Sequence, residues 1–94
     1  MDAIQIWNEM KMVALSTRMS LSQDEISQKR KMLAELYRKY LMSIPPENRN
    51  LCEGILVNGK LITIRRTDIP DLIMKDDFVF KHIINKLTAY YEQK

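Results

Sequence analysis

Side chains that could perform chemistry are few in this chain of 94 residues. His82 is the single histidine, and it falls on the polar side of a predicted helix, where we expect a solvated residue. The usual zinc patterns need further ligands of this kind. Cys52 is the single cysteine, and as a nucleophile it would need a neighbouring base and an electropositive pocket. The sequence indicates neither, so a structural cysteine is the simpler interpretation.

Carboxylates and glycines give no stronger signal for catalysis. Asp76-Asp77, and the pair Asp68 and Asp71, could serve metal binding or acid–base chemistry, but helix caps and turns explain them more simply. Gly54 and Gly59 are the only glycines, which are too few for a phosphate-binding loop. We therefore expect no enzyme activity, no catalytic residue, no metal and no cofactor.

Basic residues give the chain a net charge of +3, from 15 Lys and Arg against 12 Asp and Glu. Acids are interleaved with these bases, whereas nucleic-acid-binding proteins usually concentrate basic charge on one face or tail. Lys31, Glu35 and Lys39 follow one another at intervals of four, which is typical of a solvated helix face. The alternative function left open is nucleic-acid binding, in which phosphates would contact Lys29, Arg30, Lys31, Arg38, Arg65 and Arg66.

Composition narrows the class of protein. Hydrophobic residues make up 46% of the chain, with only 2 Gly and 3 Pro, which argues against a disordered or low-complexity sequence. No apolar run approaches the roughly 18–20 residues that span a bilayer. The first residues carry acids and no basic segment ahead of an apolar stretch, unlike a secretory signal. We expect one small domain over residues 1–94, in the cytoplasm and away from membranes.

Hydrophobic periodicity predicts two helices in the first half of the chain. Over residues 2–17, apolar residues recur at spacings of three and four, and Asp2 is a suitable N-cap. The second helix begins at the capping box Ser22-Gln23-Asp24-Glu25 and ends at Pro45-Pro46. Because only residues 18–21 connect them, we expect the two helices to be antiparallel.

The second half changes period and predicts a β-hairpin followed by a helix. Asn58-Gly59 is the signature of a type I′ turn, and the residues on either side are apolar and largely β-branched. A short turn or helix over residues 67–74 would have Pro70 in its first turn. An amphipathic helix then follows Asp76-Asp77. Its apolar face comprises Val79, Phe80, Ile83, Ile84, Leu87, Tyr90 and Tyr91. The expected fold class is α+β, in the order α-α-β-β-α.

The predicted hairpin has apolar residues on both faces. Leu56 and Leu61 share one face, and we expect this face to meet the helices. The outer face would then carry Ile55, Val57, Ile62 and Ile64. A two-stranded ribbon is also marginal in water and leaves two unpaired edges. A second copy would cover the outer face, most simply as a twofold dimer, whereas in the alternative monomer the helices would cover both faces.

Further apolar residues fall outside the buried stripes of the two N-terminal helices, and methionine is frequent, with seven in the chain. Methionine lines surfaces that adapt to partners. The sequence therefore predicts a non-catalytic interaction protein, a small regulator or inhibitor that binds a protein partner and forms a homodimer. The candidate interface residues are Ile4, Met12, Leu15, Met32, Met42, Ile55, Val57, Ile62 and Ile64.

Overall fold

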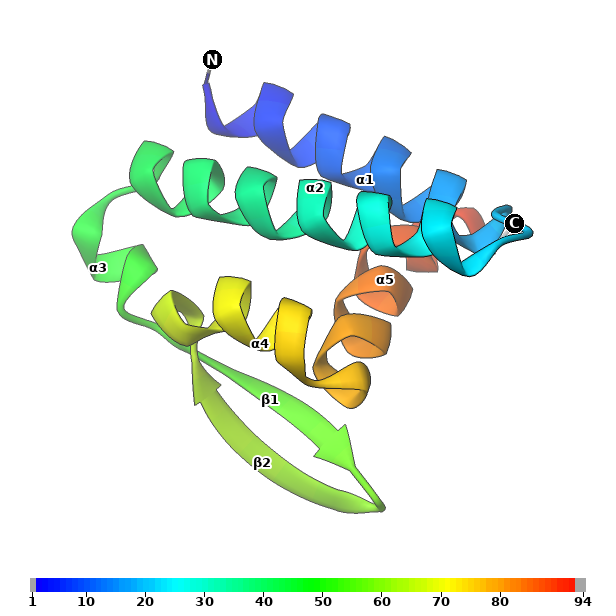
Figure 1. The fold of residues 1–94 in the computed structure, drawn as a ribbon. Helices are drawn as coiled ribbons and strands as arrows, with labels where there is room; N and C mark the ends of the chain where they lie inside the picture. Colours follow the sequence, from blue (N-terminus) through cyan, green and yellow to red (C-terminus); the bar gives the residue numbers. More distant parts are fainter. Residues whose placement is uncertain (1, 93–94) are drawn as a thin grey trace.

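The computed structural model describes the backbone of residues 2–92 and the side chains of residues 2–89. The chain forms α1 (Ala3–Arg18), α2 (Gln23–Ser43), α3 (Pro46–Arg49), β1 (Cys52–Val57), β2 (Lys60–Arg65), a 3-10 turn η1 (Arg66–Asp68), α4 (Ile69–Lys75) and α5 (Asp77–Glu92) (Figure 1). This order confirms the predicted α+β class, with a helical hairpin, a β-hairpin and a C-terminal helix. The side chains expected at Tyr90 and Tyr91 lie outside the described residues.

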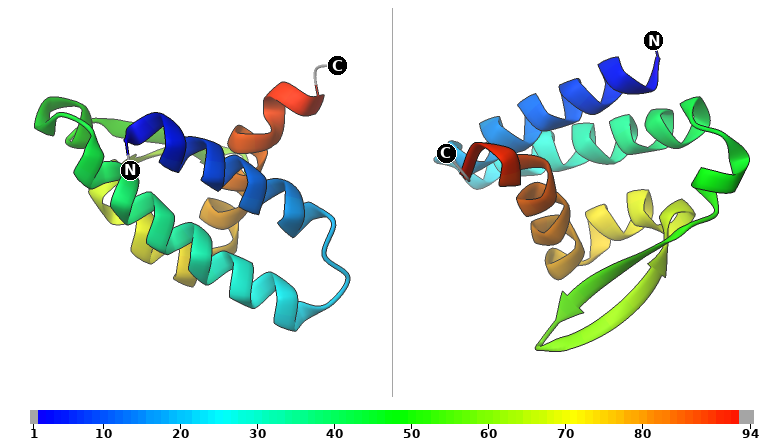
Figure 2. Two further views of the ribbon diagram at one scale, coloured as in Figure 1. Left: turned by 90° about the horizontal axis from the view of Figure 1, so that it is seen from above. Right: turned by 180° about the vertical axis from the view of Figure 1, so that it is seen from behind.

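The helices form two layers with the β-hairpin below them. α1 and α2 lie side by side and antiparallel, at the top of Figure 1. α4 packs against α2 and α5 packs against α1, while β1 attaches the hairpin to α5 (Figures 1 and 2). The core lies between these layers. Its largest fully buried side chains are Met10, Leu33, Ile55, Ile69, Ile73, Ile83, Leu87, Val79 and Thr88.

Side-chain caps fix where the long helices begin. The Asp2 carboxylate accepts a hydrogen bond from the Gln5 N–H at 2.9 Å, and the Ser22 hydroxyl accepts one from the Glu25 N–H at 3.2 Å. The Asp76 carboxylate accepts from two N–H groups in the first turn of α5, at 2.9 and 3.2 Å. The three predicted N-caps are confirmed. Glu25 does not complete its capping box, because its carboxylate pairs with Lys29 at 3.9 Å.

The β-hairpin has the predicted register. Leu56 lies opposite Leu61, and Ile55 lies opposite Ile62. Asn58 and Gly59 both have positive φ, at 51° and 79°, as a type I′ turn requires.

The two faces of the hairpin are oriented in the opposite way to the sequence expectation. Ile55 is fully buried, and Val57 and Ile64 pack against the core, so the assignment of these three to an outer face was wrong. Leu56 and Leu61 are 65% and 70% exposed. Strand alternation fixes which residues share a face, but not which face meets the helices.

Burial of Ile55, Val57 and Ile64 favours this orientation, and Glu53 supports it. Glu53 lies on the same face as Ile55, and its carboxylate accepts hydrogen bonds from Lys86 of α5 at 2.6 and 2.9 Å. The ion pair therefore lies on the same face as the buried Ile55, and both hold this face against the helices. Ile62 shares that face but is 38% exposed.

Candidate interaction site

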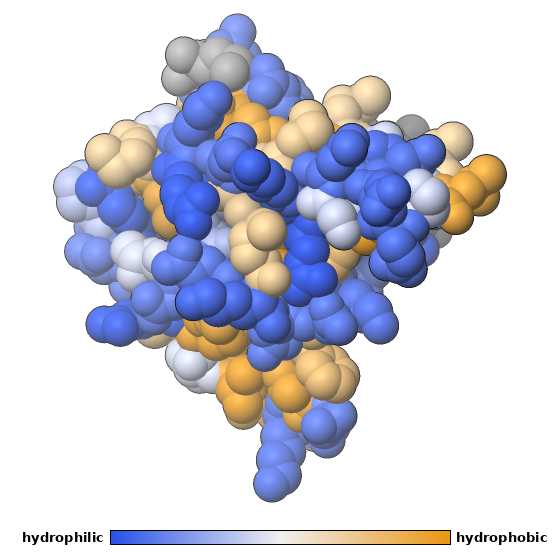
Figure 3. Space-filling model, in the orientation of Figure 1, coloured by the Kyte–Doolittle hydropathy of each residue, from blue (hydrophilic) through white to orange (hydrophobic). Residues whose placement is uncertain are grey.

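The outer face of the hairpin carries an apolar surface, which we call the hairpin patch, made by Leu56 and Leu61. These leucines are directly paired across the two strands, and both are mostly exposed. Leu61 leans over Gly54, because a Cβ atom placed on that glycine would lie 3.3 Å from Leu61 Cδ1. Orange atoms gather in the lower part of the molecule, over the hairpin, above a blue tip (Figure 3). The hairpin patch is thus a compact apolar surface without a cover from the described chain.

The strands beneath this patch also have open edges. β1 and β2 hydrogen-bond only to each other, so within residues 2–92 neither outer edge carries a further strand. All of β2 except Ile64 is exposed. A ribbon of two strands is stabilised when a further strand or sheet packs on it. The hairpin therefore combines exposed leucines with two strand edges that have no neighbouring strand among the described residues.

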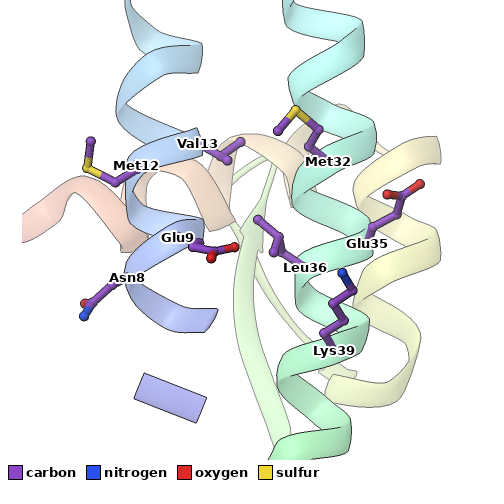
Figure 4. Close-up of a pocket in the computed structure, with 8 residues that line it drawn as sticks. All are labelled: Asn8, Glu9, Met12, Val13, Met32, Glu35, Leu36 and Lys39. Carbon is purple, nitrogen blue, oxygen red and sulfur yellow. The ribbon is translucent and has the colours of Figure 1, made fainter. Parts of the chain in front are cut away.

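A second apolar surface lies between α1 and α2, and we call it the methionine groove. Met12 and Val13 from α1, with Met32 and Leu36 from α2, form its apolar lining (Figure 4). Asn8, Glu9, Glu35 and Lys39 form its polar rim. The groove encloses about 520 Å³ and faces away from α4, α5 and the hairpin, which lie behind it in Figure 4. Met12 and Met32 are 63% and 50% exposed.

The structure brings together only some of the predicted helical interface residues. Met12 and Met32 line the same groove, as described. Met42 lies in an adjoining hollow with Ile6, Arg38 and Lys39, and this hollow shares Lys39 with the methionine groove. Ile4 is exposed elsewhere, in a hollow lined by Trp7 and Tyr40. Leu15 is half-buried and lines none of these hollows.

Most of the predicted phosphate contacts are engaged within the chain. Arg38 pairs with Asp71 at 2.7 Å, and Arg65 pairs with Asp68 at 3.2 Å. Arg66 donates to the Asn48 carbonyl at 3.1 Å.

The basic residues of the first turns of α2 are similarly held. Arg30 pairs with Asp77 at 2.8 Å, donates to the Ile73 carbonyl and stacks on Phe80 with its guanidinium carbon 4.6 Å from the ring centre. Lys29 donates to the Ser20 hydroxyl at 2.6 Å. Of the six candidates, Lys31 alone is exposed with no bond to another described side chain. The set does not form a free basic strip.

A charged cluster between β1 and α5 was missed from the sequence. The Glu53 side chain is only 12% exposed, and it contacts Lys86 and lies 4.0 Å from His82 Nε2. His82 is therefore half-buried rather than solvated as expected. Partial burial lowers the pKa of His82, although the Glu53 carboxylate opposes this shift. Burial raises the pKa of the neighbouring Tyr37, and the Glu53 charge adds to this effect.

The described part of the chain has neither a cluster of metal-ligating side chains nor a helix suited to span a membrane. Among the described side chains, no three His, Cys, Asp or Glu residues lie where they could hold a metal ion together. None of the described helices has both the length and the apolar character needed to cross a membrane. No family model, curated protein or solved structure matches this chain.

Proposed function

We propose that this chain is a non-catalytic interaction protein, a small regulator or inhibitor that binds a protein partner and forms a homodimer through the hairpin patch. The observation that carries the proposal is the pair Leu56 and Leu61, opposite one another on two strands and 65% and 70% exposed. In the dimer, the outer faces of two hairpins stack about a twofold axis. The four leucines then form a small core between two sheets.

The charges on this face favour a second copy as the occupant. Arg65 is the one charged residue among the six outer-face positions of the two strands, and it is already paired with Asp68. Two copies can therefore stack without like charges opposing each other. Binding of nucleic acid is less well supported, because phosphate contacts would have to displace the carboxylates that hold Arg30, Arg38 and Arg65.

The free energy of association is expected to be small. Four leucines, each about two-thirds exposed, contribute about 4–8 kcal/mol when buried, at roughly 1.5–3 kcal/mol for a fully exposed side chain. Association costs roughly 4–15 kcal/mol of translational and rotational freedom and side-chain ordering. The most favourable balance of these terms, about 4 kcal/mol, corresponds to a dissociation constant of about 1 mM, so the dimer should be weak and should form at protein concentrations approaching 1 mM.

A cytoplasmic location is part of the same proposal. Cys52 is exposed and free. An exposed unpaired thiol is suited to a reducing compartment, where glutathione and thioredoxin keep cysteines reduced.

Sedimentation equilibrium of two matched leucine variants tests the homodimer. Leu61→Lys places a charge in the hairpin patch and should give a folded monomer. Leu21→Lys makes the same change at a leucine that is 99% exposed between α1 and α2, and it should associate like the wild type. Wild-type protein that stays monomeric up to about 1 mM would refute the proposal. Equal association of the two variants would also refute it.

A further inference from the structure

The methionine groove has the dimensions of a site for a helix. Its α2 wall runs from Met32 to Lys39, and the adjoining hollow extends this wall to Met42. Ten residues of helix rise about 15 Å, which is nearly three turns. The lining residues recur along each helix at spacings of three and four, so the walls present ridges that a third helix can pack between.

The lining of the groove is suited to a protein side-chain surface. Val13 points from α1 toward α2, and Met32 and Leu36 point from α2 toward α1, while Met12 extends the apolar lining to the outer side of α1 (Figure 4). Methionine side chains are flexible and polarisable, so they can adjust to leucine, isoleucine or phenylalanine side chains of a bound helix. The other side of α1 and α2 is already covered by two helices, α4 and α5. A helix bound in the groove would pack on the open side of α1 and α2, as α4 and α5 pack on their other side.

The charges at the rim indicate which charge a partner should carry beside its apolar face. Glu9 points across the groove toward α2, and Glu35 lies on the far rim (Figure 4). Neither forms an ion pair with a side chain that the structure describes, whereas Glu53, Asp71 and Asp77 are each paired with a cation. The rim therefore carries two free carboxylates against one lysine, Lys39, and this excess of negative charge favours a partner with Lys or Arg beside its apolar face.

We propose that the methionine groove binds an amphipathic helix of a partner protein, with its apolar face on Met12 and Met32 and a basic residue beside Glu9 and Glu35. This inference rests on the proposed function in that it names the chemistry of the protein partner. It uses a surface on the opposite side of the molecule from the hairpin patch (Figures 1 and 4). The groove and the dimer can therefore be tested separately.

The probe is a fluorescently labelled synthetic peptide of about four helical turns. It carries leucine at positions i, i+3, i+4 and i+7, with lysine flanking them and alanine elsewhere, which is the pattern of helices that bind in grooves. Fluorescence anisotropy with the full chain should give saturable binding at micromolar concentrations. A peptide with glutamate in place of lysine should bind about tenfold more weakly, because the Glu9 and Glu35 charges then repel it. A peptide of the same composition with scrambled leucines should not bind.

Matched variants of the protein test whether the peptide binds in the methionine groove. Met32→Glu should abolish peptide binding, while Met19→Glu, the same change at a methionine that is 79% exposed at the end of α1, should leave it unchanged. Glu9→Lys is the second variant, because it leaves the apolar lining intact. Glu9→Lys should weaken binding of the lysine peptide and strengthen binding of the glutamate peptide by similar factors.

Sedimentation of the same proteins separates this inference from the dimer. Met32→Glu should still associate like the wild type. Absence of peptide binding, or equal binding of the lysine and glutamate peptides, would overturn the inference while leaving a measured dimer intact. Loss of self-association in Met32→Glu would overturn it too, since a second copy would then be the occupant of the groove.

Discussion

At the scale of single residues, Glu53 links the hairpin to α5. Its carboxylate is largely buried and receives two hydrogen bonds from Lys86, at 2.6 and 2.9 Å. The Lys86 ammonium also lies 6.0 Å from the centre of the Trp7 ring, within reach of a cation–π interaction. One lysine of α5 thus contacts both β1 and α1.

Lys86→Met should destabilise the fold by about 2 kcal/mol, because it keeps most of the unbranched stem but leaves a buried carboxylate without its donor. The free energy of unfolding in urea measures this loss. The double variant with Glu53→Gln should recover part of the stability, since the unpaired charge is then removed. If the single variant unfolds at the same urea concentration as the wild type, the Glu53–Lys86 pair does not stabilise the hairpin.

His82 should make stability depend on pH. Burial lowers its pKa in the folded state below the ordinary value, so the unfolded chain binds a proton at higher pH than the folded chain does. The contribution of neutral His82 is therefore full above about pH 6.5 and is lost as the pH falls below that value. Compared with His82→Gln, the wild type should lose stability between about pH 7 and about pH 5 in urea titrations. A relative gain on acidification would show that the Glu53 charge outweighs burial.

At the scale of elements, local signals predicted the three long helices α1, α2 and α5 and the hairpin turn, but not the short helix α3, and long-range contacts set how these elements pack. Asp2 and Ser22 cap their helices through residues three positions away, and Asn58-Gly59 sets the hairpin register from within the turn. The face of the hairpin that meets the helices is held by long-range contacts, such as the ion pair of Glu53 and Lys86, which are 33 residues apart. No periodicity in the sequence links them. The outer position of Leu56 and Leu61, and hence the hairpin patch, could not be predicted from the sequence without the tertiary structure.

Two substitutions in the hairpin test this orientation. Ile55→Lys should prevent folding, because Ile55 is fully buried and a lysine ammonium there would be removed from water. Leu61→Lys should leave a folded domain, since Leu61 is 70% exposed. Circular dichroism with thermal unfolding distinguishes the two. The opposite result, a folded Ile55→Lys and an unfolded Leu61→Lys, would restore the orientation expected from the sequence.

At the scale of the whole molecule, the two apolar surfaces lie on different layers. The methionine groove belongs to α1 and α2, and the hairpin patch lies beyond α4 at the other end (Figure 1). A dimer through the hairpin patch would leave both grooves accessible. Two linked grooves bind a partner that carries two helices more tightly than one groove does, by raising the effective concentration for the second contact.

An isotope-filtered NOE experiment tests the dimer most directly, using mixed wild-type chains of which half carry labelled leucine methyl groups. Such an experiment detects only contacts between different copies. At a protein concentration of about 1 mM, where the weak dimer should be well populated, cross-peaks should connect the methyl groups of Leu56 and Leu61 in one copy with those of the same leucines in the other. The account is contradicted if no intermolecular cross-peak is seen, or if the cross-peaks arise instead from Leu36 in the methionine groove.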